Sequence, residues 1–382
     1  MTVKLYDENS YLTEFDATVE TCEKTDSEYK VTLDKTAFFP EEGGQCCDRG
    51  NLDGKSVKKV EISGDEIYHY VDSPFEIGQK VRGEIDFSLR FRNMQNHSGE
   101  HIICGIAHSL FGYENVGFHL GEDIVTMDLS GELSDSDIEK IERLANEAVA
   151  KNMPVTAFYP SKEELETLQY RAKGEIEGNV RIVNIGDVDS CACCAPHVGA
   201  TGEIGIIKII DSMRHRGGMR LSILCGFDAL SDYNLRMKEA KEISNLLSVP
   251  QSEIALGVKK LNSDQQMLKT KISEMKKQIV KLTVESADTT KEKLCLFFDD
   301  MDMDGLRFGA NLLLEKKVPF AALLSGDDEN GYSYVLVTSE GDISTHTKSA
   351  NEALSGRGGG KGPMATGKFM AKLSDIEKYF VK

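Results

Sequence analysis

The stretch Asn96-His-Ser-Gly-Glu-His101 carries the strongest local signal in the chain. It lies within residues 89–111, where the sequence pattern predicts a helix, and side chains four positions apart share one face of a helix. His97 and His101 can therefore direct both imidazole rings at one metal ion. Alone, two histidines at this spacing are a weak signal, because many such pairs are ordinary surface residues.

A second cluster, Cys191-Ala-Cys-Cys-Ala-Pro-His197, strengthens the metal interpretation. Cys193 and His197 are again four residues apart, and Cys193 follows the histidine pair by 193 − 101 = 92 residues. Together the clusters offer the imidazole and thiolate ligands that suit Zn²⁺. They predict one zinc site. Cys193 is the preferred thiolate, with Cys191 and Cys194 left open as alternatives.

The chemical role of such a site stays open at this point. A closed site with four protein ligands is typical of a structural ion. A weak fourth ligand would instead leave a coordination position for water, which allows metal-assisted hydrolysis. The first cluster also fits H-x-x-E-H, the inverted zinc-peptidase pattern. That pattern needs a further carboxylate ligand, so the second cluster disfavours a peptidase.

Length and composition limit the classes of protein to which the chain can belong. The length of 382 residues, divided by about 150 per domain, predicts two or three domains. With 45 Lys+Arg against 63 Asp+Glu the net charge is −18, which excludes a polycation that coats nucleic acid. No apolar run reaches the length of a membrane span, which is about 18 residues or more. Nine cysteines without a secretory signal favour a cytoplasmic protein.

The pattern along the chain predicts an α+β multidomain protein. Short alternating strands in residues 1–88 indicate an antiparallel β-barrel. Residues 89–228 mix helices and strands and hold both zinc clusters. Residues 229–287 read as a helical spacer or coiled coil, and residues 288–382 as a C-terminal α/β domain.

Within the second segment we expect a helix over residues 135–151, capped by Ser134. Strands are expected at residues 155–158, 180–185, 204–210 and 221–225.

The spacer carries a heptad seam. Its apolar positions are Ile254, Val258, Leu261, Leu268, Ile272, Met275, Ile279 and Leu282, interrupted by Gln265. Residues 251–283 contain seven lysines and three acids, a local charge of +4. The segment is interpreted either as a solvated helical hairpin or as a spacer that faces tRNA or forms a homodimer.

Two glycine-rich stretches add candidate ligand contacts. Gly43 and Gly44 permit a close backbone approach or positive φ, and Gln45 offers donors and an acceptor beside them, although such a pattern alone is more often an ordinary turn. Near the C-terminus, Arg357 and Lys361 stand among glycines that can cradle phosphate, unless this loop is a flexible surface hairpin.

In this order the motifs resemble those of stand-alone alanyl-tRNA editing proteins of the AlaX type, in the long form. The same motifs occur in the editing and C-terminal domains of alanyl-tRNA synthetase. The resemblance rests on residues 36–50, 92–101, 193–205 and 356–365. It covers nearly the whole chain, but not the aminoacylation half of the synthetase, so the chain is not expected to charge tRNA.

The resemblance implies a fold, a cofactor and a reaction. It implies Zn²⁺ at His97, His101, Cys193 and His197. It implies an amino-acid pocket lined by Thr36, Gly43, Gly44 and Gln45. The implied reaction is the hydrolysis of tRNA(Ala) misacylated chiefly with serine, with glycine as a second substrate. Two departures, Cys194-Ala-Pro196 and Glu100, leave the ligand types unchanged but alter the pocket.

Editing explains why these residues are needed. A pocket built for alanine rejects an added hydroxyl only about 10²-fold, so a second site must read that hydroxyl. Thr36 is the candidate reader and Gln45 its helper, while Glu100 is a candidate base acting through water. The simpler interpretation of Glu100 is a solvated helix carboxylate.

The remaining candidates concern tRNA and alternatives to catalysis. Arg220, with Arg214 and Arg216, offers a basic patch for the acceptor stem, or a salt bridge in the fold. The spacer and the C-terminal domain are candidate surfaces for a homodimer, while the heptads equally allow an intramolecular hairpin. The competing function is a tRNA-binding module with a purely structural zinc.

Overall fold

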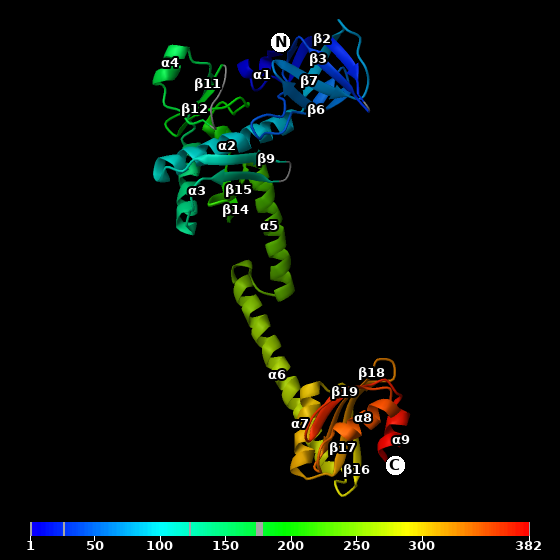
Figure 1. The fold of residues 1–382 in the computed structure, drawn as a ribbon. Coiled ribbons are helices and arrows are strands. Elements are labelled where there is room, and N and C mark those ends of the chain that lie inside the picture. Colours follow the sequence, from blue (N-terminus) through cyan, green and yellow to red (C-terminus); the bar gives the residue numbers. More distant parts are fainter. Residues whose placement is uncertain (1, 26, 122–123, 173–178, 382) are drawn as a thin grey trace. The chain divides into compact units, whose positions relative to one another are not determined.

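A computed structural model describes residues 2–25, 27–121, 124–172 and 179–381. The chain forms two compact units, Met1–Glu239 and Ala240–Lys382. Each unit mixes helices with β-sheet (Figure 1), which confirms the prediction of an α+β multidomain protein. The finer division at residues 88, 228 and 287 stays a prediction.

The first unit begins with a closed barrel, whose strands follow the order β2-β3-β7-β6-β5-β8 with antiparallel pairing throughout. The strands are β2 (Glu14–Lys24), β3 (Tyr29–Leu33), β5 (Gly50–Leu52), β6 (Lys55–Ser63), β7 (Glu66–Val71) and β8 (Lys80–Ile85). Val31, Leu33 and Phe38 fill its interior and are fully buried. Before the barrel, β1 (Val3–Lys4) leads into α1 (Leu5–Glu8) and pairs with β4 (Lys35–Thr36).

Helix α2 (Phe87–Phe111) organises the rest of this unit. Asp86 caps its start by accepting hydrogen bonds from two backbone N–H groups of the first turn. The helix ends at Gly112, whose φ of 70° is the left-handed conformation that glycine adopts readily. Every residue in Asn93–Ala107 is buried. Because no face of this stretch is exposed, α2 crosses the interior of the unit.

Two antiparallel sheets and helix α3 (Asp135–Ala150) surround α2 (Figure 1). One sheet has the order β14-β15-β10-β9, with β9 (Asn115–Leu120), β10 (Val125–Leu129), β14 (Ile207–His215) and β15 (Gly218–Cys225). The other has the order β11-β12-β13, with β11 (Val155–Phe158), β12 (Ile182–Ile185) and β13 (Asp189–Ala192). Helix α4 (Lys162–Thr167) follows β11.

The local predictions here hold in part. Ser134 caps α3, as expected, in a capping box with Asp137. The strand predicted at residues 204–210 is wrong in its first half. Thr201–Ile204 forms a 3₁₀ turn, Gly205 follows with φ of 81°, and β14 begins only at Ile207. The positive φ of Gly205 turns the chain before the strand can start.

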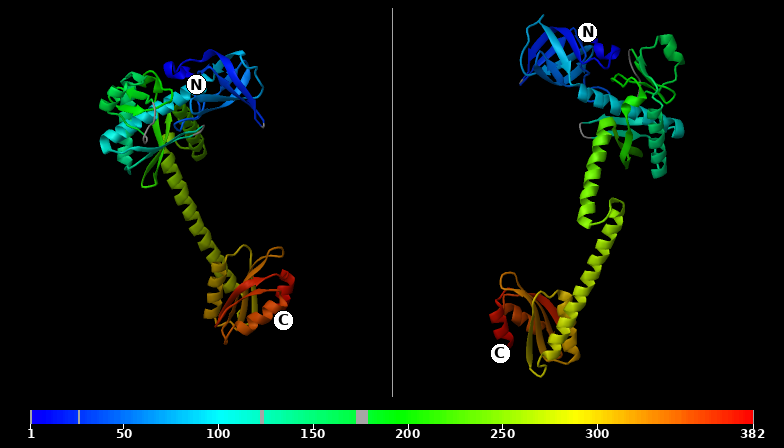
Figure 2. Two further views of the ribbon diagram at one scale, coloured as in Figure 1. Left: turned by 45° about the horizontal axis from the view of Figure 1, so that its top comes forward. Right: turned by 180° about the vertical axis from the view of Figure 1, so that it is seen from behind.

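The second unit holds a five-stranded sheet of order β16-β17-β18-β20-β19. The strands are β16 (Lys293–Phe298), β17 (Phe320–Asp327), β18 (Gly331–Thr338), β19 (Arg357–Gly359) and β20 (Met364–Phe369). Helix α7 (Met303–Glu315) covers one face, and α8 (Ser344–Ala353) and α9 (Leu373–Val381) cover the other (Figure 2). Each face has its own apolar core.

Two long helices precede this sheet. Helix α5 (Gly226–Leu247) crosses the boundary between the units, and α6 (Ile254–Ser286) belongs to the second. Only the end of α6 is packed: Val280 and Val284 are buried in the core that includes α7. Much of its seam is exposed, including Leu268 at 61%. No helix in the described ranges combines the length and apolar character needed to cross a membrane.

Candidate metal centre and adjoining pocket

The four side chains named as zinc ligands come together in the first unit. The donor atoms of His97, His101, Cys193 and His197 all lie within 4.8 Å of one another. Cys193 Sγ is 3.6 Å from His97 Nε2 and 3.4 Å from His197 Nε2. In a tetrahedral site with Zn–S near 2.3 Å and Zn–N near 2.0–2.1 Å, neighbouring sulfur and nitrogen ligands are about 3.6 Å apart. The donor set therefore fits zinc.

The second nitrogen of each imidazole is held by a partner. His97 Nδ1 donates to Gln45 Oε1 at 2.7 Å, and His101 Nδ1 donates to Asp189 Oδ2 at 3.0 Å. His197 Nδ1 lies 3.0 Å from the hydroxyl of Ser98. With Nδ1 carrying the proton, Nε2 of the first two rings keeps its lone pair, which is the form that binds a metal.

Position and charge favour Cys193 among the three cysteines. Burial opposes ionisation of its thiol, but the neighbouring imidazoles hold the pKa of Cys193 well below its ordinary value. Burial raises the pKa of both Cys191 and Cys194. Cys191 belongs to a separate potential ligand group with His101 and Asp189. Since the thiolate is the metal-binding form, Cys193 suits the site best.

The glycine turn is built against this centre. Backbone hydrogen bonds of 3.2 and 3.0 Å join Glu42 and Gln45, and Gly43 and Gly44 take φ of 63° and 86° between them. The Gly44 carbonyl accepts a hydrogen bond of 2.8 Å from the N–H of Leu120 on β9. The turn is thereby docked on a strand, which brings the Gln45 side chain to His97.

We expect substitution of Gly44 by alanine to lower the free energy of unfolding by about 2–5 kcal/mol. Alanine disfavours the left-handed backbone conformation of this position, and its Cβ would overpack the neighbouring strand. A Cβ at Gly44 would stand 2.4 Å from the backbone oxygen of Phe118. Gly78→Ala is the matched control, because Gly78 has φ of 82° and nothing within 4 Å of its Cβ position. Gly78→Ala should lower the free energy of unfolding by about 1–2 kcal/mol, from the backbone conformation alone. If urea unfolding showed the same loss of unfolding free energy for both variants, the close approach of Gly44 to the Phe118 backbone would be contradicted.

A cavity of about 370 Å³ adjoins the metal-ligand cluster. Its lining combines ligands of the cluster with charged and small residues of the first unit. These include Lys4, Glu42, Gly43, His97, Glu100, His101, Asn115, Tyr159, Arg171, Arg181, Cys193 and Cys194. The volume is in the range of small-molecule sites, so the pocket can hold an aminoacyl group.

Glu100 faces this cavity and is not a solvated helix carboxylate, because it is only 2% exposed. Its Oε1 accepts hydrogen bonds from Asn115 Nδ2 and, at 3.2 Å, from the Cys104 thiol. Its Oε2 lies 4.0 Å from His101 Nε2. One carboxylate oxygen is thus fixed in place while the other is directed toward the metal-ligand cluster.

Thr36 lies elsewhere. It is fully buried and is not among the residues that line the cavity. Its hydroxyl accepts from the Phe38 N–H at 3.1 Å and lies 2.8 Å from His69 Nε2. These contacts give Thr36 a structural role beside the barrel core. Its contact with a serine hydroxyl stays a prediction.

Arg220 is engaged in an ion pair. Its guanidinium donates to both oxygens of Asp128, at 2.6 and 2.7 Å, across the pairing of β15 with β10. Arg214 pairs with Glu132 at 3.0 Å. The arrangement matches the salt-bridge alternative for this patch, and a contact of Arg220 with tRNA stays a prediction.

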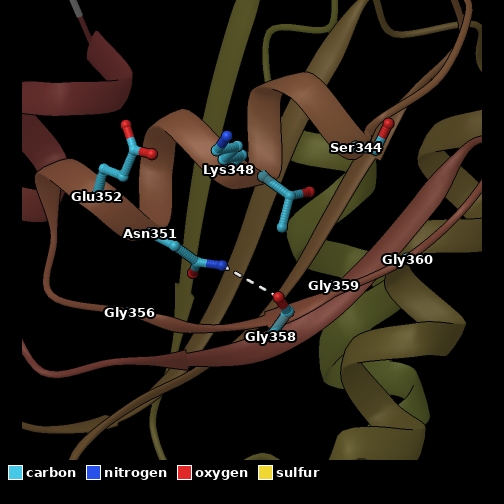
Figure 3. Close-up of a pocket in the computed structure, with 9 residues that line it drawn as sticks. Ser344, Lys348, Asn351, Glu352, Gly356, Gly358, Gly359 and Gly360 are labelled. Carbon is cyan, nitrogen blue, oxygen red and sulfur yellow. Dashed lines mark hydrogen bonds between the residues drawn. The ribbon is translucent and has the colours of Figure 1, made fainter.

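Arg357 and Lys361 are exposed in the second unit. Beside them, a cavity of about 280 Å³ lies between α8 and β19, lined by the backbones of Gly358, Gly359 and Gly360. Figure 3 shows Asn351 of α8 donating to the Gly358 carbonyl, a bond of 3.1 Å. The two predicted cations do not line this cavity, whereas Lys348 does.

Sequence reasoning missed several polar residues of the site, of which three hold the ligands and Glu100 in place. Asp189 is almost fully buried and bridges His101 and Arg171, whose guanidinium donates to it at 2.7 and 2.8 Å. Asn115 holds Glu100, and Ser98 contacts His197. Ser98 stands next to His97, and Asp189 stands four residues before Cys193, but such neighbours carry no signal unless the packing is known.

Part of this site matches a known family. Residues 180–221 match the Threonyl and Alanyl tRNA synthetase second additional domain. That segment contains β12, β13 and the loop with Cys193 and His197. Fold and site thus define a protein with a synthetase-type accessory domain around a potential metal centre.

Comparison with curated proteins extends the match to nearly the whole chain. Alanyl-tRNA editing protein AlaX-L of Pyrococcus horikoshii is 26% identical over 98% of this chain and 96% of its own length. Alanyl-tRNA editing protein Aarsd1 of Mus musculus is 27% identical over 97% and 94%. Alanine–tRNA ligase of Pyrococcus furiosus is 32% identical, but the chain spans only 42% of it. The chain is thus a relative of the AlaX-type alanyl-tRNA editing proteins, and the resemblance predicted from its motifs is confirmed.

Proposed function

We propose that this chain is a zinc-dependent cytoplasmic hydrolase that removes serine, and secondarily glycine, from misacylated tRNA(Ala). The observation that carries the proposal is the convergence of His97, His101, Cys193 and His197 beside the 370 Å³ cavity. The names of the relatives support tRNA(Ala) as the substrate.

The reaction is hydrolysis of the ester that joins the amino acid to the terminal ribose. A water oxygen bonds to the ester carbonyl carbon, and the bond from that carbon to the ribose oxygen breaks. The ribose oxygen takes up the proton that the water loses, and serine and tRNA(Ala) are released. Glu100 is our candidate to carry this proton through Oε2, which lies 4.0 Å from His101 Nε2.

Other residues of the chain hold and select the substrate. Zinc bound at the cluster would supply a fixed positive charge beside the pocket; to polarise an oxygen of substrate or water it would have to take a fifth ligand or release one of the four side chains. Gln45, Ser98 and Asp189 orient the imidazoles. Thr36 and Gln45 stay the candidates for distinguishing serine from alanine, and the buried Gln45 Nε2 has no hydrogen-bond partner among the described residues.

The test is deacylation of purified Ser-tRNA(Ala), Gly-tRNA(Ala) and Ala-tRNA(Ala) by the zinc-loaded full chain. We expect release of serine and glycine with Ala-tRNA(Ala) spared. Tight tRNA binding without release would favour a binding module with a structural zinc. Casein cleavage with intact tRNA would favour a peptidase.

We further propose that the C-terminal unit binds the tRNA backbone through Arg357 and Lys361. The double substitution of both residues by alanine should weaken tRNA binding roughly tenfold and reduce the salt slope by about 1.4–1.8, since two phosphate contacts are lost. Filter binding across a salt series measures both effects. The control, Lys317→Ala with Lys378→Ala, removes the same charge from other exposed positions. Equal losses in both double variants would contradict the assignment.

We also propose that α6 forms a parallel homodimer. In heptad register, Val258, Ile272 and Ile279 occupy a positions. Leu261, Leu268, Met275 and Leu282 occupy d positions. Branched residues at a with leucine at d favour two parallel strands. The exposure of these side chains within the unit supports a second copy as their partner.

Leu268→Lys should convert this dimer to a monomer in sedimentation equilibrium, because two ammonium groups would meet at one core layer. The control Gln266→Lys places the same charge on an exposed position outside the seam and should leave the dimer intact. A monomeric wild type, or a dimer that survives Leu268→Lys, would refute the proposal.

A further inference from the structure

One carboxylate of the pocket is unusually placed. Glu42 is partly exposed and lines the cavity next to Gly43 and Cys194, whose thiol contacts its side chain. Its Oε2 is nevertheless buried without a hydrogen-bond partner in the described part of the chain. A buried charged acceptor without a partner is costly, since it has lost water without gaining a protein donor. Such a group in a binding pocket is best explained by a donor that arrives with the ligand.

The backbone leaves Glu42 little freedom to move away. It opens the turn that is closed by hydrogen bonds to Gln45, and that turn is docked on β9 through Gly44. On its far side the turn faces the loop after β13, because a Cβ at Gly43 would lie 3.6 Å from Cys194 Sγ. The buried Oε2 is therefore held at the pocket wall.

The cations around the cavity already have partners or lie apart from this oxygen. Arg171 is bound to Asp189 and Arg181 pairs with Asp7 at 3.5 Å. Lys4 also lines the cavity, but no described cation, Lys4 included, pairs with Glu42 Oε2. Glu42 is also outside the potential metal-ligand groups found among the described residues. Its negative charge is left for a cationic donor of the substrate.

We propose that Glu42 binds the α-ammonium group of the aminoacyl ester, an assignment that rests on the proposed function. An α-ammonium group carries three N–H donors and a positive charge, and hydrogen bonds between opposite charges are the strong ones. This contact assigns the amine to the turn and frees the metal-ligand cluster for the ester and water. It also selects aminoacyl-tRNA with a free amine over tRNA whose amine is acylated, because an amide is uncharged and offers the carboxylate only one N–H donor.

The test uses binding, so that it does not depend on turnover. The probes are two stable amides of 3′-amino-3′-deoxyadenosine, one carrying serine and one carrying glyceric acid, in which a hydroxyl replaces the amine. Calorimetry on the zinc-loaded full chain gives the dissociation constants of wild type, Glu42→Gln and Glu41→Gln. Glu41 is the matched control, because it is the exposed neighbour of Glu42. Thermal melting confirms that each variant is folded.

Wild type should bind the seryl probe about 10–100-fold more tightly than the glyceryl probe, the range expected for one charge-assisted hydrogen bond. Glu42→Gln should bring this ratio to within about threefold of unity, because only the binding of the seryl probe is weakened. Glu41→Gln should keep the wild-type ratio. A ratio near unity in wild type, an unchanged ratio in Glu42→Gln, or equal weakening of both probes would overturn the assignment. A wild type that prefers the seryl probe but releases no serine from tRNA would refute the hydrolase and leave the ammonium site standing.

Discussion

Substitution of His101 by alanine is expected to abolish zinc binding and deacylation together. The ring is 4% exposed, its Nδ1 is bound to Asp189, and its donor atom belongs to the four-residue cluster. Its loss removes a ligand and leaves the buried Asp189 carboxylate with Arg171 alone. Changes to residues that only orient ligands cost 10–100-fold, so loss of a ligand should lower kcat/KM by roughly 10³-fold or more. The melting temperature should also fall, because metal binding is coupled to folding.

His108→Ala is the control for this prediction. His108 lies on the same helix, but its side chain is 45% exposed and pairs with Glu114 at 2.9 Å. We expect this variant to keep one zinc per chain in elemental analysis and to deacylate Ser-tRNA(Ala) as wild type does. Retention of zinc and rate by His101→Ala would refute the metal centre.

The sequence predicted the parts of this centre that depend on spacing along one element. His97 and His101 share a helix face because they are four residues apart, and α2 forms where the pattern placed it. Alternation of apolar and polar residues likewise predicted a barrel of short strands within residues 1–88, and a closed barrel forms there. In both cases the information is local to the segment.

The parts that the sequence could not settle depend on contacts between segments. Glu100 is buried only because Asn115 and the Cys104 thiol meet it inside the unit, which its helical position cannot reveal. Thr36 faces His69 because β4 adjoins the barrel, and no spacing rule relates residues 36 and 69. The choice of Cys193 over its neighbours likewise needed the positions of three imidazoles from distant segments.

Glu100→Gln is the second change with a large expected effect. Glutamine keeps the shape of the side chain and an oxygen that can accept from Asn115 and Cys104, but it cannot take a proton from water. Since general bases contribute about 10²–10⁴-fold, kcat for Ser-tRNA(Ala) should fall by at least about 10²-fold. Zinc content and melting temperature should stay close to wild type. Single-turnover deacylation measures the chemical step directly.

Glu139→Gln serves as the control, because it removes the same charge from an exposed position on α3. It should deacylate as wild type does, which excludes an effect of net charge on tRNA binding. If Glu100→Gln released serine at the wild-type rate, Glu100 would be reduced to a structural partner of Asn115. The proton would then have to leave by another group of the pocket, and Glu100 would lose its place in the proposed chemistry even though its buried position suits it.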